Sequence, residues 1–330
     1  MRFLRLFLIG SLLISTPTFA GFLEGENAFK NKQYSEAFNE FMPLAKQGDF
    51  RSQYYIGYLY FNGYGVSRDE RRAIEYLQRA VDQNYNMAQA LLAYAYAEGR
   101  GVARNQRKAL ELYEKAAAQG NASALLNLGV MYYTGAGVNI DYKKAFDYFS
   151  KVPSTEKPIV QTYLGDMYFK GLGVSQDYKK AFEYYMNSAL AGDIYAVYML
   201  GNMYQNGNGV SENMDKAIEY YTYAASKNHA LSAYVLGLIY ANGESVARDV
   251  VKGYAWLSVA AEQKLPAAEK ARKTLENSMS LSEIERARRE ILTSQQQMQL
   301  AVSPVSKTAL KEAMEPSKRS RSSVRRRRRL

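Results

Sequence analysis

Six glycine-containing tetrapeptides are the residues of this 330-residue sequence that most resemble a chemical site. They read GYGV, GRGV, GAGV, GLGV, GNGV and GESV, and they start at Gly63, Gly99, Gly135, Gly171, Gly207 and Gly243. A glycine-rich turn can hold a phosphate, but none of these has the third glycine of a dinucleotide loop or the Gly-Lys-Ser/Thr of a P-loop. Because their starts are 36 residues apart without a slip, they indicate a structural repeat instead of nucleotide sites.

Side chains suited to catalysis or metal binding are scarce. The sequence has no cysteine and one histidine, His229, which excludes disulfides, thiolate zinc sites, cysteine nucleophiles and histidine-based triads. It contains no G-x-S-x-G, H-E-x-x-H or EF-hand pattern. His229 falls between two expected helices, where it is expected to cap a helix or lie at the surface. We therefore predict a protein that is not an enzyme and that uses no metal and no cofactor.

The glycine turns are expected to connect pairs of helices. Other columns keep the 36-residue step, among them Tyr60, Tyr96, Tyr132, Tyr168, Tyr204 and Tyr240. In the first repeat, positions 53, 56, 57 and 60 share one helix face, and positions 73, 76, 77 and 80 share another. This spacing predicts helix A over about 52–61, a glycine turn that ends it, and helix B over about 70–83. Asp69 and its equivalents are placed to cap helix B.

The segment TYLGDMYFKGLGVSQDYKKAFEYYMNSALAGDIYA, residues 162–196, resembles a Sel1-like repeat, which is related to the TPR repeat. Six consecutive units over 52–265 follow the same pattern, and the last resembles the closing repeat of bacterial members. The resemblance implies an all-α fold, an α/α superhelical solenoid of 36-residue helix–loop–helix repeats that serves as a protein-interaction scaffold. Some cysteine-rich members of the family are linked to β-lactam binding, and nothing in this cysteine-free sequence supports carrying that activity over.

The sequence divides into five regions. We expect a signal peptide over 1–20, a degenerate helical repeat or cap over 21–51, six repeats over 52–265, capping helices over 266–293, and a polar, then Arg-rich, disordered tail over 294–330. Pro153 and Pro158 interrupt the third repeat, so its helix B is expected to stop near Lys151. Ser280 and Glu283 have the spacing of a capping box before the last helix.

The first twenty residues have the pattern of a secretory signal. A positively charged start is followed by an apolar run from Leu6 to Ile14 and a small residue at Ala20, after which cleavage is expected. The run is shorter than the about 20 residues that a spanning helix needs. We expect an exported protein in the periplasm, with secretion as the alternative.

Most of the net positive charge comes from the C-terminal segment. The net charge is +11, and residues 317–330 contain eight lysines and arginines and no acid. Their longest run is Arg325, Arg326, Arg327, Arg328 and Arg329. Such a run suggests nucleic acid in a cytosolic protein, but behind a signal peptide the expected polyanion is an anionic lipid or an acidic glycan. A solvated end without a partner is the alternative.

Helix A also has positions that vary between repeats. Positions 51, 55, 58 and 62 lie on one face of the first helix A, and these positions with their equivalents at 36-residue steps are here called the variable columns. Helix A lines the concave side of such superhelices, which leaves the variable columns free for partners. The candidate partner-binding residues are Tyr55, Tyr58, Met87, Tyr94, Tyr163, Tyr195 and Met199, since tyrosine and methionine are typical of interfaces. Random drift at these positions is the alternative.

Taken together, these patterns predict an exported, non-enzymatic scaffold that binds unidentified partner proteins through its concave face. One alternative is a cell-envelope assembly module that binds peptidoglycan or polysaccharide. The other is a hydrolase, for which the sequence offers no catalytic constellation.

Overall fold

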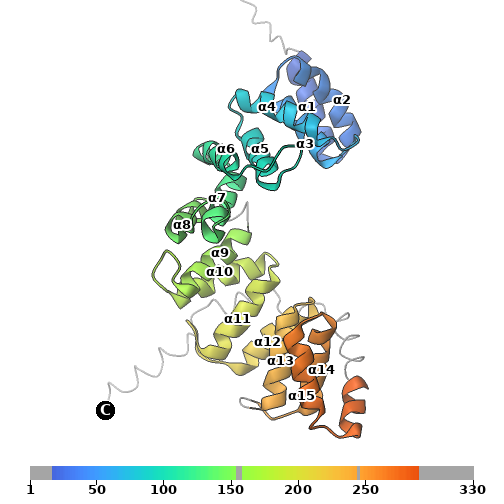
Figure 1. Ribbon diagram of the computed structural model, residues 1–330, viewed down its shortest axis with the longest axis vertical. Coiled ribbons are helices and arrows are strands. Elements are labelled where there is room, and N and C mark those ends of the chain that lie inside the picture. The colour runs from blue at the N-terminus through green and yellow to red at the C-terminus, as the bar shows by residue number, and fades with distance from the viewer. Residues whose placement is uncertain (1–16, 154–157, 244–245, 290–330) are drawn as a thin grey trace, which may run out of the picture. The chain divides into compact units, whose positions relative to one another are not determined.

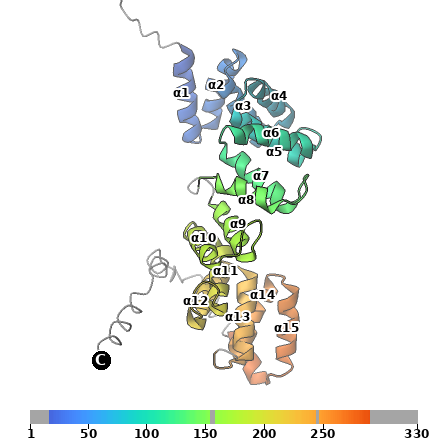
Figure 2. The same cartoon turned by 90° about the vertical axis from the view of Figure 1, so that its left-hand side faces the viewer.

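The computed structural model describes residues 17–153, 158–243 and 246–289 (Figures 1 and 2). Within these residues the protein is helical and has no strand, which confirms the predicted all-α repeat fold. The helices are α1 (Pro17–Lys30), α2 (Tyr34–Lys46), α3 (Phe50–Asn62), α4 (Glu70–Asp82), α5 (Asn86–Glu98), α6 (Gln106–Ala118), α7 (Ala122–Thr134), α8 (Tyr142–Ser150), α9 (Ile159–Lys170), α10 (Tyr178–Leu190), α11 (Ile194–Asn206), α12 (Met214–Ser226), α13 (Ala230–Asn242), α14 (Val250–Glu262) and α15 (Pro266–Glu276). Residues 281–289 are also helical. In this part of the chain, no helix combines the length and the hydropathy needed to cross a membrane.

The helices form two compact units, which divide between Asp141 and Tyr142. The first unit contains α1 to α7, and the second contains α8 to α15. Within each unit a helix packs against its neighbours in sequence, as α3 packs against α2 and α4, and as α14 packs against α13 and α15 (Figure 1). The odd-numbered helices from α3 to α13 are the A helices of the six repeats, and the even-numbered helices that follow them are the B helices.

The glycine turn has a structural explanation at both of its glycines. Gly171 ends α9 in the left-handed conformation, with φ of +69°, which favours glycine. Gly173 also has φ of +69°, and a Cβ there would lie 2.5 Å from the carbonyl oxygen of Tyr142, at the start of helix B in the preceding repeat. The second glycine therefore lets the turn rest directly on the backbone of the previous repeat.

Short polar residues after the turn cap the B helices, as predicted. In five repeats the side chain before helix B accepts a hydrogen bond, at 2.9–3.0 Å, from the backbone N–H three residues further on. These capping residues are Asp69, Asn105, Asp177, Asn213 and Asp249.

Small residues inside the A helices bring the two helices of a repeat together. A Cβ on Gly57 would lie 2.7 Å from Leu77 Cγ, and a Cβ on Gly165 would lie 2.8 Å from the ring of Tyr185. Leu77 and Tyr185 are completely buried. The helix propensity that glycine loses, about 1 kcal/mol, is thus offset by close packing.

The tyrosine column joins neighbouring repeats. Tyr204 meets the ring of Phe182 from the preceding repeat edge-on, at 5.7 Å between centroids, and stacks on Tyr220 of its own repeat at 5.5 Å. The ammonium group of Lys216 lies 5.0 Å from the centre of the Tyr204 ring. The lysine covers the outer side of the ring while its charge stays near solvent.

The third repeat differs from the others where the prolines predicted it would. Its helix B, α8, ends at Ser150 after nine residues, whereas α10 in the next repeat has thirteen. The predicted capping box is also confirmed. The Ser280 N–H donates to Glu283 Oε2 at 2.8 Å, and the Glu283 N–H donates to Ser280 Oγ at 3.3 Å, which starts the helix over 281–289.

Candidate partner-binding surface

The variable columns of the first repeat are partly covered by the protein's own side chains. Tyr55 stacks on Phe41 of α2, with ring centroids 4.5 Å apart and planes 3° apart. Burial, together with the Glu26 carboxylate, raises the pKa of Tyr55 to about 12. Tyr58 contacts the ring of Phe29 in α1 at 5.6 Å. Both predicted residues therefore help to hold α3 against the first two helices.

Large apolar side chains that stay exposed gather on the same columns. Among the residues that the structure describes, eight large hydrophobic side chains are exposed, and four of them occupy variable columns. They are Met87 (42% exposed), Tyr94 (38%), Ile159 (46%) and Leu231 (42%). Single exposed apolar residues are common, but three of these four share the column of position 51. Repetition at one column is expected of an interaction surface.

Three predicted residues lie in the C-terminal unit, and their environments differ. Tyr163 stacks on Phe149 with ring centroids 4.8 Å apart. The Tyr195 hydroxyl donates a hydrogen bond to Asp166 Oδ1 at 3.3 Å, which links α11 to α9. Met199 is 6% exposed and belongs to the core of this unit. The structure therefore leaves little of Met199 for a partner, while a binding role for Tyr163 and Tyr195 stays a prediction.

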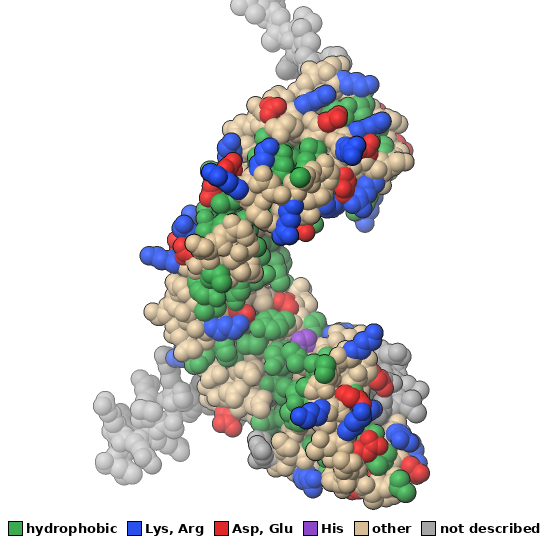
Figure 3. All heavy atoms as spheres, viewed as in Figure 1, with side chains coloured by type: hydrophobic (Ala, Val, Ile, Leu, Met, Phe, Trp, Pro, Cys, Tyr) green, Lys and Arg blue, Asp and Glu red, His purple; other side chains and the backbone are tan. Residues whose placement is uncertain are grey.

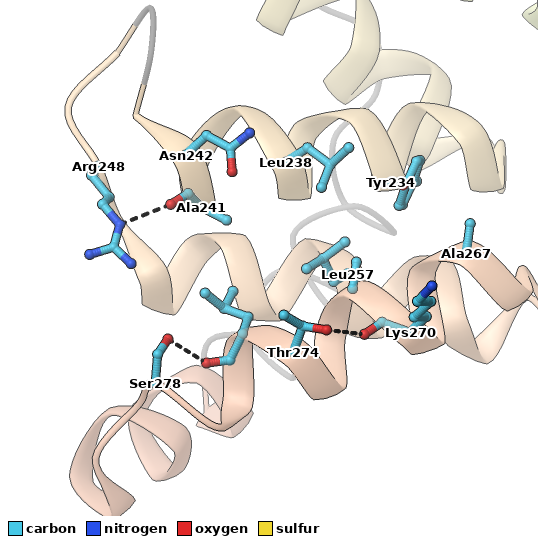
Figure 4. Close-up of a pocket in the computed structure, with 12 residues that line it drawn as sticks. Tyr234, Leu238, Ala241, Asn242, Arg248, Leu257, Ala267, Lys270, Thr274 and Ser278 are labelled. Atoms are coloured by element: carbon cyan, nitrogen blue, oxygen red, sulfur yellow. Dashed lines mark hydrogen bonds between the residues drawn. The ribbon is translucent and has the colours of Figure 1, made fainter.

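A pocket of about 610 Å³ lies in the C-terminal unit between α13, α14 and α15 (Figure 4). Each helix contributes a leucine: Leu238 from α13, Leu257 from α14 and Leu275 from α15. These leucines belong to one hydrophobic cluster, in which Leu257 is 1% exposed. The pocket thus has an apolar floor that is continuous with the core.

The variable columns line this pocket. Counting in 36-residue steps from 51, 55, 58 and 62 leads to Ala267, Ala271 and Thr274 in α15 and to Ser278 just after it, and all four line the pocket. On α13, Leu238 and Asn242 occupy the same columns. Ala271 stands in the column that holds Tyr55 and Tyr163 in other repeats, so a small side chain leaves room where those repeats have a ring. α15 therefore follows the register of a seventh helix A.

The sequence interpretation missed these α15 residues because it treated 266–293 as capping helices. The columns that identify a repeat are lost in α15 and the turn after it, where the usual leucine, tyrosine and first glycine are replaced by Arg272, Glu276 and Met279. Only the unbroken count of 36 residues could have found them.

Positive charge stands at both ends of the pocket (Figure 4). Arg248 lies at one end, where its Nε donates to the Ala241 carbonyl oxygen at 3.0 Å, and Lys270 lies at the other. In the described residues neither cation forms an ion pair, and no acidic side chain lines the pocket. The acids on nearby segments are engaged: Glu269 pairs with basic residues of its own helix, and Glu283 accepts the hydrogen bonds of the capping box.

The charged surface elsewhere is mixed in sign. On the face drawn in Figure 3, lysines and arginines alternate with acidic side chains over the outer helices of each unit, and hydrophobic side chains gather over the C-terminal unit before α14. Described residues include no group of three or more His, Asp or Glu side chains that could hold a metal ion. The arginines of the predicted tether, 325–329, lie outside the described residues.

His229 caps a helix, as the sequence predicted. Its Nδ1 accepts a hydrogen bond from the Ser232 N–H at 3.3 Å at the start of α13, and its ring lies 5.0 Å from that of Tyr198. Burial lowers the pKa of His229, and the Asp193 carboxylate partly opposes this shift. The only histidine is thus explained by capping and packing.

Comparison with known proteins identifies the family. The family model for the Sel1 repeat matches residues 51–85, 86–121, 122–151, 158–193, 194–229 and 230–265, which is more than half of the chain. The protein belongs to the Sel1 repeat family. Such proteins are commonly scaffolds for protein interactions and are generally not enzymes.

Two solved structures resemble the chain closely enough to support this assignment. One is a protective antigen present in uropathogenic Escherichia coli strains, which displays an SLR fold; it is 27% identical, with a TM-score of 0.71 over 86% of this chain. This protein spans 62% of the antigen's length. The other is a Sel1 repeat protein from Oxalobacter formigenes, which is 29% identical, with a TM-score of 0.64 over 73% of this chain and 96% of its own.

Proposed function

We propose that the protein is an exported scaffold without catalytic activity, which binds partner proteins along the variable columns of its A helices. The observation that carries this proposal is the recurrence of exposed Met87, Ile159 and Leu231 in one column, with Tyr94 in another. A preformed helical surface binds with little ordering cost on its own side, so exposed apolar anchors on it can contribute directly to affinity.

Export is the part of the proposal that the N-terminal sequence supports. Cleavage after Ala20 would shorten α1 but would keep Phe22, whose ring contacts Phe41 at 5.6 Å and Tyr55 at 6.1 Å. The mature protein would therefore retain the packing of α1 on α2 and α3. N-terminal sequencing of the protein from fractionated Gram-negative cells tests this: Gly21 as the first residue in the periplasmic fraction supports export, and an intact Met1 in the cytosol contradicts it.

The binding surface is tested best at positions whose side chains do not hold the fold. Tyr55 and Tyr163 stack closely on core rings, whereas exposed Tyr94 makes only an edge contact with Phe61 at 6.2 Å, so the better variant is Met87→Ser with Tyr94→Ser. A photo-crosslinking residue at Tyr94 should capture discrete proteins in cells, and the same label at Ile140, which is 56% exposed outside the variable columns, should capture fewer. The serine variant should reduce capture from a label at Ser123, which stands in the same column in α7 of the same unit, whereas Ile140→Ser should not.

Two results would contradict the proposal. If Tyr94 and Ile140 capture the same proteins equally, the variable columns have no special role. If labels on the columns capture no protein while the purified chain is retained on peptidoglycan or another envelope polysaccharide, the alternative function of an envelope-assembly module is correct.

A further inference from the structure

We infer that the pocket between α13, α14 and α15 binds a short segment of a partner protein in which apolar residues are flanked by two carboxylates. The inference rests on the proposed function, since it assigns one stretch of the variable columns to one chemical class of partner. The apolar floor, the charges at the two ends and the length of the pocket each support it.

The floor of the pocket is suited to apolar side chains. Leu238, Leu257 and Leu275 supply it, and Ala271 in place of a larger residue leaves the space above them open. Burial of apolar surface in such a site favours binding in proportion to the area removed from water, before the costs of association. Two leucine-sized side chains therefore account for the main attraction.

The ends of the pocket select negative charge. Arg248 and Lys270 stand at opposite ends (Figure 4), and neither forms an ion pair among the described residues; the Glu283 carboxylate interacts with Arg248 only at longer range, without a salt bridge. The Arg248 Nε–H is held by the Ala241 carbonyl oxygen, which fixes the direction of the guanidinium group. A fixed guanidinium is suited to bind a carboxylate.

The length of the pocket fits a peptide of about five residues. It follows α13 from Tyr234 to Asn242, which are eight positions apart, and at 1.5 Å per residue that separation is about 12 Å. An extended chain advances about 3.3 Å per residue, so carboxylates at positions one and five would reach the two cations. Residues two and four of that segment point to the same side and can enter the pocket together. Residues one and five start from the opposite side of the chain, so their long glutamate side chains turn back over the two ends of the pocket to reach the cations.

An open groove favours a peptide over an enclosed small molecule. Asn242, Ala267, Thr274 and Ser278 line the pocket and are exposed, so solvent reaches it along the side of the helices. Small-molecule sites usually bury most of their ligand's surface. An open groove between neighbouring helices instead suits a segment that continues beyond both ends.

The inference is tested with synthetic peptides and the full mature chain. The probe is an immobilised peptide with the core Glu-Leu-Ala-Leu-Glu, and the matched peptides are Lys-Leu-Ala-Leu-Lys and Glu-Gly-Ser-Gly-Glu. The basic segment 317–330 can attract both acidic peptides equally, so the difference between the two acidic peptides reports the pocket. Retention on the first peptide should exceed retention on each of the others about fivefold.

Substitutions then separate charge from apolar contact. The double variant Arg248→Glu with Lys270→Glu should lose the preference for the acidic peptide and gain one for Lys-Leu-Ala-Leu-Lys. The control, Lys143→Glu with Lys179→Glu, makes the same change in net charge at exposed sites of the same unit outside the pocket, and should keep the original preference. Thr274→Trp, at an exposed position, should fill the pocket and abolish retention without changing helicity.

Three results would overturn the inference. They are equal retention on the two acidic peptides, a charge-swapped variant that behaves like its control, and a photo-crosslinker at Thr274 that reacts with residues 290–330 of its own chain or with a second copy instead of the peptide. In each case, capture of proteins from Tyr94 in the other unit would still be observed if the proposed function is correct, because that label lies in α5.

Discussion

At the scale of single residues, the second glycine of the first five turns is required by close contact with the preceding repeat as well as by its own backbone conformation. In Gly173→Ala the new Cβ would lie 2.5 Å from the Tyr142 carbonyl oxygen. The alanine would also have to adopt φ of +69°, a conformation that residues with a side chain rarely adopt. Backbone has no flexible end that could move away, so the turn must shift off the preceding repeat. We expect a loss of about 3 kcal/mol in the free energy of unfolding, measured by chemical denaturation.

Gly192 provides the matched control for that substitution. It has φ of +97° and nothing within 4 Å of a new Cβ, and it lies in the same unit. Gly192→Ala therefore adds only the conformational cost of a left-handed residue, about 1 kcal/mol. Equal losses in the two variants would mean that contact with Tyr142 contributes nothing and that both glycines serve backbone conformation alone.

His229 makes the stability of α13 depend on pH. Burial holds its pKa below the ordinary value of 6.5, so the unfolded chain binds a proton more readily than the folded one. The contribution of His229 is fully present above pH 6.5 and is lost as the pH falls below it. Wild-type protein should therefore lose more stability between pH 7.5 and pH 5.5 than His229→Asn, in which asparagine can still cap the helix.

Thermal unfolding at the two pH values measures this difference. His229 is the only histidine, so no other side chain has an ordinary pKa in that interval. An equal loss of stability in wild type and His229→Asn would show that the ring titrates in the folded protein as it does in the unfolded chain.

At the scale of elements, α8 and α10 form a natural pair for comparison. They begin with the same five residues, Tyr-Lys-Lys-Ala-Phe, but α8 has nine residues and α10 has thirteen. Both helices have the same number of backbone groups without an intrahelical partner at their ends, but the shorter helix has fewer internal hydrogen bonds between those ends. Backbone amides of α8 should exchange with deuterium faster than the equivalent amides of α10, as measured by mass spectrometry. Equal rates would mean that packing, and not helix length, sets local stability here.

The helices themselves were predictable because the glycines and tyrosines repeat without a slip. A C-cap glycine must stand where helix A ends, and Asp69 or its equivalents must stand where helix B begins, so the bounds followed from local chemistry. The site was less predictable. Tyr55 and Met199 share a column, yet one stacks on Phe41 and the other lies in the core, because each faces different neighbours. A position whose residue varies between repeats is not needed for the repeat pattern, but its side chain is not thereby exposed to solvent.

At the scale of the whole molecule, the repeat region has almost no net charge, whereas the C-terminal segment is strongly basic. Residues 317–330 contain eight of the lysines and arginines, and they lie outside the described residues. The repeats carry acids and bases in nearly equal number, so they offer no comparable attraction to a polyanion. Any binding of this chain to an anionic membrane surface should therefore depend on its last fourteen residues.

That dependence defines the final prediction. A basic segment contributes about 1 kcal/mol per Lys or Arg close to a strongly anionic surface, and salt screens the attraction. Eight cations would then hold the scaffold at a membrane surface without a spanning helix. Mature protein should sediment with phosphatidylglycerol-containing vesicles at low salt and be released at high salt, and protein that lacks residues 317–330 should remain in the supernatant at both. If truncation leaves sedimentation unchanged, or if salt has no effect on it, the segment is not an electrostatic tether.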